Sequence, residues 1–86
     1  MDLGLDYEAE KLVARLRECE EAFEELKRTA SECQRALASG RKEEVMSKLS
    51  SFLGALSKFE HELSHLSASA STILAKLVEA EGEEGS

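Results

Sequence analysis

The chain has 86 residues and a formal net charge of −7, with no proline and no tryptophan. A chain of this length forms at most one small domain. It lacks the basic stripe that neutralises phosphate groups, so its composition argues against binding to nucleic acids or anionic membranes. It also lacks an apolar run of about 18 residues, the length that a transmembrane helix needs. The sequence therefore predicts a soluble, cytoplasmic protein.

The first predicted helix covers residues 6–38, where apolar side chains recur in strictly alternating steps of four and three. With Leu5 at position d of a heptad abcdefg, this run fills positions a and d, as in a coiled coil. Its members are Leu5, Ala9, Leu12, Leu16, Cys19, Phe23, Leu26, Ala30, Cys33 and Leu37. Asp6 is the predicted N-cap, and Glu8 falls in the first turn.

Gly40 marks the predicted end of this helix, because glycine readily adopts the left-handed conformation that follows helix C-termini. Glu43 and Glu44 fall in the first turn of the next helix, where negative charge is favourable. The predicted turn covers residues 39–41. So short a connection makes two neighbouring helices pack antiparallel.

The second predicted helix covers residues 42–80 and repeats the same alternation with Val45 at position d. Its a and d residues are Val45, Leu49, Phe52, Leu56, Phe59, Leu63, Leu66, Ala70, Ile73, Leu77 and Ala80. Serines at residues 67–72 lower helix propensity and could interrupt the helix. Because the apolar phase passes through them unshifted, we favour a continuous helix. Residues 81–86 are acidic and glycine-rich, so we expect a flexible tail there.

These patterns predict an all-α antiparallel two-helix hairpin with coiled-coil packing, forming a single domain over residues 1–80. The apolar stripe is wider than one helix contact requires, because further apolar residues fall at position e. A second hairpin would cover the surplus, so we expect pairing into a four-helix bundle, with a monomeric hairpin as the alternative. The expected interface residues are Val13, Met46, Leu53, Leu74, Ser67 and Ala70.

The two cysteines, Cys19 and Cys33, cannot form a disulfide within one helix. Their separation corresponds to about 21 Å along the helix axis, whereas a disulfide requires Cα atoms within about 7 Å. We expect small, packed thiols in a reduced protein. An intermolecular disulfide or a reactive thiol is the alternative.

Residues 61–65 read His-Glu-Leu-Ser-His and match the H-E-x-x-H pattern of helical zinc proteases. In the heptad frame, Leu63 falls in the predicted helix contact, while His61 and His65 fall at the outer positions f and c. The acids that follow lie on the same helix, so no third ligand is apparent. Glu62-x-x-His65 also matches one element of di-iron bundles, but positions a and d hold no ionic residue. We expect no catalytic residue and no cofactor. A surface metal site at the His61/His65 pair is the alternative.

An acidic cluster lies in the middle of the first predicted helix and comprises Glu18, Glu20, Glu21, Glu24 and Glu25. Glu18 and Glu25 fall at position c, away from the predicted contact, so we expect a solvated face. Glu20 falls at position e and is the member best placed to contact a partner helix.

The sequence as a whole favours a non-enzymatic module for protein–protein interaction through helices. The expected partner is a second copy of the chain, and another helical protein in a larger complex fits the pattern equally well.

Overall fold

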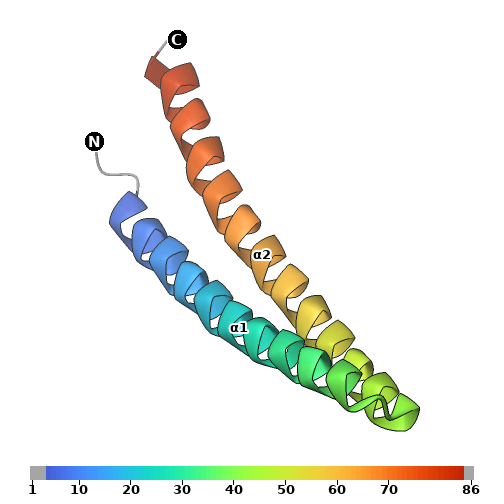
Figure 1. Cartoon of the computed structure of the whole chain (residues 1–86). Coiled ribbons are helices and arrows are strands. Elements are labelled where there is room, and N and C mark those ends of the chain that lie inside the picture. Colours follow the sequence, from blue (N-terminus) through green and yellow to red (C-terminus); the bar gives the residue numbers. More distant parts are fainter. Residues whose placement is uncertain (1–3, 85–86) are drawn as a thin grey trace.

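A computed structural model describes residues 4–84, which form two α-helices, α1 (Leu5–Ser39) and α2 (Lys42–Glu84). The helices pack against each other as an antiparallel hairpin, with the start of α1 and the end of α2 at the same end (Figure 1). The molecule is a rod of 67 × 18 × 12 Å. No strand occurs in residues 4–84. The predicted all-α hairpin is therefore confirmed.

The N-terminus of α1 differs from the prediction. The N-cap is Gly4, with φ of 69°, and no side chain caps the helix. Asp6 lies within the first turn, together with Glu8. The prediction of Asp6 as N-cap is wrong because glycine tolerates a positive φ, which lets the chain enter the helix before Asp6. Both carboxylates still face the favourable end of the helix dipole.

The turn confirms the role predicted for Gly40, which has φ of 74°. Its N–H group donates to the carbonyl oxygens of Ala36 and Leu37, each at 3.3 Å. The Ser39 hydroxyl donates to the Ala36 carbonyl at 2.7 Å. Together these bonds satisfy carbonyl groups that the end of α1 would otherwise leave unpaired.

α2 runs without a break through the serine-rich stretch at residues 67–72. Within it the Thr72 hydroxyl donates to the Ala68 carbonyl at 3.0 Å, so this side chain is satisfied inside the helix. α2 ends at Glu84, beyond the predicted end at residue 80, so residues 81–84 are helical. Residues 85–86 of the expected tail lie outside the described residues. Neither helix has an apolar stretch that could cross a membrane.

The helices meet through a different face from the predicted one. Every d residue is buried or half-buried, as predicted, but position g supplies the other half of the contact. The a residues Leu16, Phe23 and Leu63 remain 46%, 45% and 42% exposed. Adjacent positions on a heptad wheel are about 51° apart, so each helix is rotated by roughly that angle from the predicted orientation. The contacting g residues are Glu8, Arg15, Ala22, Thr29 and Ala36 in α1 and Lys48, Ala55, Glu62, Ser69 and Lys76 in α2.

The size of the g residues explains this rotation. Half of the contacting g residues are small, namely Ala22, Thr29, Ala36, Ala55 and Ser69. Small side chains let helix backbones approach closely and increase their dispersion contacts. Leucine and phenylalanine at position a would hold the two helices further apart. The prediction treated the apolar a residues as the contact because it followed hydrophobicity and ignored side-chain volume.

Cys19 and Cys33 both lie at position d in this contact. They are free, and they are 4% and 8% exposed. The expectation of small, packed thiols is confirmed.

Candidate functional site

The rotation leaves one side of the hairpin strongly apolar. Of the twelve exposed large hydrophobic side chains among the described residues, ten lie at positions a or e. In an antiparallel pair that meets through d and g, positions a and e of both helices project to the same side. We call these ten residues the apolar face: Val13, Leu16, Phe23, Leu37, Met46, Leu49, Leu53, Leu63, Leu74 and Leu77.

One aromatic contact ties the apolar face to the helix contact. The rings of Phe23 in α1 and Phe59 in α2 have centroids 5.6 Å apart. Phe23 is at position a and Phe59 at position d, so the apolar face begins directly beside the helix contact. An exposed apolar surface on one side of a molecule is typical of a site where another protein binds.

The structure leaves all six predicted interface residues exposed. Val13, Met46, Leu53 and Leu74 belong to the apolar face, with the small residues Ser67 and Ala70 at its e and a positions. Leu63 was predicted to lie between the helices, and this is wrong. Because position a is turned outward, Leu63 lies on the apolar face.

The opposite side of the hairpin, which we call the polar edge, is formed by positions c and g and carries charged residues. Among residues 4–82, three ion pairs cross it between the helices: Glu8–Lys76 at 3.2 Å, Glu32–Lys48 at 3.6 Å and Glu25–Lys58 at 3.7 Å. Charged residues therefore lie between the helices through position g, although positions a and d hold none. Glu8, for example, is only 7% exposed.

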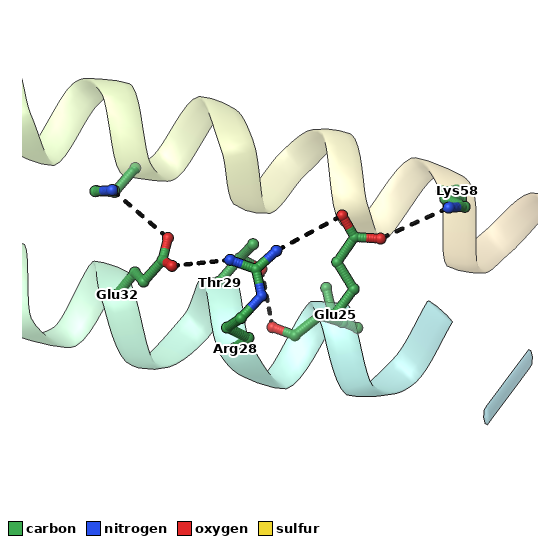
Figure 2. Close-up of polar contacts among 7 residues, drawn as sticks. Glu25, Arg28, Thr29, Glu32 and Lys58 are labelled. Carbon is green, nitrogen blue, oxygen red and sulfur yellow. Dashed lines mark hydrogen bonds and ion pairs between the residues drawn. The ribbon is translucent and has the colours of Figure 1, made fainter. Parts of the chain in front are cut away.

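Arg28 links two of these pairs within α1. It lies 3.8 Å from Glu25 and 2.9 Å from Glu32, and Lys58 reaches Glu25 from α2 (Figure 2). A continuous row of alternating charges thus connects the helices. Exposed pairs of this kind contribute about 0–1 kcal/mol each. Their main effect is to favour one antiparallel register, because a shift would place like charges together.

The acidic cluster of α1 is divided by this arrangement. Glu20, Glu21 and Glu24 are exposed, as expected. The side chains of Glu18 and Glu25 are 45% and 41% exposed, and they also approach α2 because position c borders the helix contact once g takes part in it. The predicted solvated face therefore also lies beside side chains of α2 at these two positions.

Glu18 meets two residues of the His-Glu-Leu-Ser-His stretch. One ligand atom from each of Glu18, Glu62 and His65 lies within 4.8 Å of the others. Glu62 and His65 are half-buried, whereas His61 is exposed with its ring centroid 4.3 Å from that of His65. On the α1 side, the Arg15 guanidinium lies 3.3 Å from the Glu18 carboxylate. The prediction that His65 lies on the outer face is wrong, because position c borders the helix contact and His65 is half-buried there.

The electrostatics of this cluster affect two neighbouring groups. Hydrogen bonding with the Glu62 carboxyl group holds the pKa of Glu18 below its ordinary value of 4.5, against an opposing desolvation effect. Arg15 and His65 also lower the pKa of Glu18. Burial raises the pKa of the Cys19 thiol, and the nearby Glu62 and Glu18 charges add to this. Cys19 is thus a protonated thiol of low reactivity.

The sequence did contain a signal for this cluster. Glu18 and Glu62 are each 22 residues from Gly40, so an antiparallel hairpin that turns at Gly40 places them at the same level. The acids that follow His65 lie on its own helix, whereas the third member of the cluster, Glu18, comes from the opposite helix.

Glu18, Glu62 and His65 are the described residues that can hold a metal ion, and the apolar face is the surface that can hold a protein. Comparison of the chain with protein-family models, curated proteins and solved structures found no match.

Proposed function

We propose that this chain is a helical protein–protein association module whose apolar face packs against the same face of a second copy, forming a four-helix bundle. The observation that supports the proposal is the one-sided distribution of exposed large hydrophobic side chains. A helix pair with such a face gains stability when a further helical layer covers it.

The packing inside the hairpin supports the same proposal. Among the described residues, no large side chain is less than 2% exposed, so the hairpin lacks a fully enclosed core. Full burial of a leucine-sized side chain contributes about 1.5–3 kcal/mol. The residues of the apolar face are already half-covered, so each would contribute roughly 1 kcal/mol. The two apolar faces of a dimer would then contribute roughly 20 kcal/mol, which exceeds the association cost of about 4–15 kcal/mol.

A second copy is the partner that this surface fits most directly. Two identical faces related by a two-fold axis match in length and width without a second gene product. On the same side of the hairpin, position e also carries charges of both signs, with Glu20 and Glu60 against Lys27. The net charge of −7 opposes self-association. Salt screens charges further apart than about 10 Å at 0.1 M, so this repulsion is small at moderate ionic strength.

Sedimentation equilibrium tests the proposal with two single substitutions. Leu53 is 62% exposed, so Leu53→Glu adds a charge to the apolar face without disturbing the contact between α1 and α2. Ser47→Glu is the matched control, because Ser47 is exposed at position f, outside both surfaces. We expect a dimer mass for the wild type and for Ser47→Glu, and a helical monomer for Leu53→Glu.

A wild-type chain that is helical by circular dichroism and monomeric at high micromolar concentration would contradict self-association. A dimer that persists unchanged in Leu53→Glu would place the interface elsewhere.

A further inference from the structure

The polar edge contains a cluster that association through the apolar face leaves unused. Three buried side-chain oxygen or nitrogen atoms among residues 4–82 lack a hydrogen-bond partner. Two of them, Glu62 Oε2 and His65 Nδ1, belong to the cluster formed with Glu18. The third is Glu8 Oε2, whose carboxylate already pairs with Lys76. Unpaired buried polar atoms are unfavourable, and a bound ion would satisfy them.

We propose that Glu18, Glu62 and His65 form a zinc site that links α1 to α2. One imidazole nitrogen and two carboxylate oxygens are ligands that zinc accepts, and a water molecule can occupy the fourth position. Two carboxylates and a neutral imidazole carry a charge of −2, which matches the ion.

The geometry requires only a modest contraction. Zinc bonds of about 2.0–2.2 Å with tetrahedral angles place two ligand atoms about 3.4 Å apart. The three ligand atoms now lie within 4.8 Å of one another. Rotation of the two glutamate side chains, which have three torsions each, can close this difference while both helices stay in place.

Solvent and ions can reach the cluster from the surface. A hollow of about 300 Å³ beside it is lined by Glu18 and Glu62, and also by Glu25 and Lys58. Arg15, 3.3 Å from Glu18, competes for the same carboxylate. Its side chain is 36% exposed and can turn into solvent when zinc binds.

This site differs from the pair that the sequence suggested. His61 and His65 lie on one helix, so zinc bound by that pair alone would involve α2 only. The proposed site includes Glu18 of α1, and zinc bound there stabilises the contact between the helices. The two possibilities therefore differ in how they respond to a change at Glu18.

Isothermal titration calorimetry with zinc chloride tests the proposal on full-length protein that lacks an affinity tag and has been treated with a chelator. Glu18→Gln removes the α1 ligand and preserves its size, while Glu10→Gln is the control because Glu10 is exposed at position b and does not line the hollow. We expect one zinc ion per chain in the wild type and in Glu10→Gln. Loss of a residue that only hydrogen-bonds to a metal ligand weakens metal binding by about 10–100-fold. Glu18→Gln removes a ligand itself, so it should weaken zinc binding by more than this.

Thermal unfolding provides a second measurement. Zinc at about 100 times its Kd should raise the Tm of the wild type by on the order of 10 °C. Glu18→Gln should show little of this increase. The same titration on Leu53→Glu separates the two proposals, because a site within one hairpin binds zinc equally well when the chain is monomeric.

Two outcomes would overturn the inference. One is a wild-type chain that binds no zinc in the calorimeter. The other is binding that survives Glu18→Gln but disappears in His61→Ala, which would assign the ion to the histidine pair on α2.

Discussion

The two long sides of the hairpin differ in what they contribute. On the polar edge, charged residues form ion pairs within the hairpin, as Glu8 does with Lys76 and Glu25 with Lys58. On the apolar face, side chains such as Leu53 and Leu74 remain more than 60% exposed, at 62% and 64%. Ion pairs have direction and fix a register, whereas apolar burial is non-directional and accepts any matching surface. The difference indicates that the polar edge aligns the helices, and it agrees with the proposal that the apolar face binds a partner.

The largest expected effect comes from increasing side-chain volume in the contact between the helices. Ala22 is 3% exposed at position g, so Ala22→Leu should destabilise the hairpin by about 1–3 kcal/mol. Ala30 is exposed at position a, and Ala30→Leu should change stability by less than about 0.5 kcal/mol. Thermal unfolding in the Leu53→Glu background, where association does not contribute, measures both. The reverse order of effects would mean that the helices meet through a and d.

A smaller effect should follow from breaking the most buried ion pair of the polar edge. Lys76→Met leaves the Glu8 carboxylate, 7% exposed, without its partner. We expect a loss of about 1–2 kcal/mol, in the lower part of the range for a buried unsatisfied group, because Lys76 is 37% exposed. Lys58→Met, at a more exposed pair, should cost less than about 1 kcal/mol.

Denaturant unfolding measures both losses. The double variant Glu8→Gln/Lys76→Met should recover part of the stability, because it removes the unpaired charge. Equal losses for Lys76→Met and Lys58→Met would contradict a polar edge whose pairs differ in burial.

The smallest expected effect is a pH dependence at Glu18. Its pKa is lowered in the folded chain, chiefly by hydrogen bonding with Glu62 and further by Arg15 and His65. A lowered carboxyl pKa stabilises the fold above the pKa of the unfolded chain, and this contribution is lost as the pH falls through the folded pKa. The difference in the free energy of unfolding between wild type and Glu18→Gln should therefore be largest at neutral pH. It should disappear at pH values below 4.5, the ordinary pKa of the glutamate side chain.

Urea unfolding at a series of pH values, with a chelator present, follows this difference. Glu10→Gln serves as the control and should show no such trend. A gap between wild type and Glu18→Gln that widens toward acid pH would reverse the sign and contradict the assigned cause.

Much of the architecture was predictable from local features. Gly40 fixes the turn because its positive φ ends α1, and the alternating spacing of apolar residues fixes two long helices on either side. The continuity of α2 through residues 67–72 was also predictable, since a loop would have shifted the apolar phase. The exposed apolar surplus, including Val13 and Leu53, followed from counting apolar side chains per turn.

The orientation of each helix about its axis was not predictable in the same way. Position d lies between a and g, so the same d residues fit either a contact through a and d or one through d and g. Hydrophobicity favours the first, and the small volumes of residues such as Ala22 and Ala55 favour the second. Only the packed pair shows which prevails, because close approach depends on the side chains of both helices together.

The candidate metal cluster depends on that orientation. The sequence by itself determined two antiparallel helices, an acidic balance and a pair of histidines one helical turn apart. The tertiary structure decided that Leu63 lies on the apolar face, and that Glu18 meets Glu62 and His65 on the polar edge. Helix formation and turns are set by neighbours along the chain. The contact between residues 18 and 62 depends on the rotation of each helix about its own axis. That rotation is decided by the side chains of both helices together, and no single segment of the sequence encodes it.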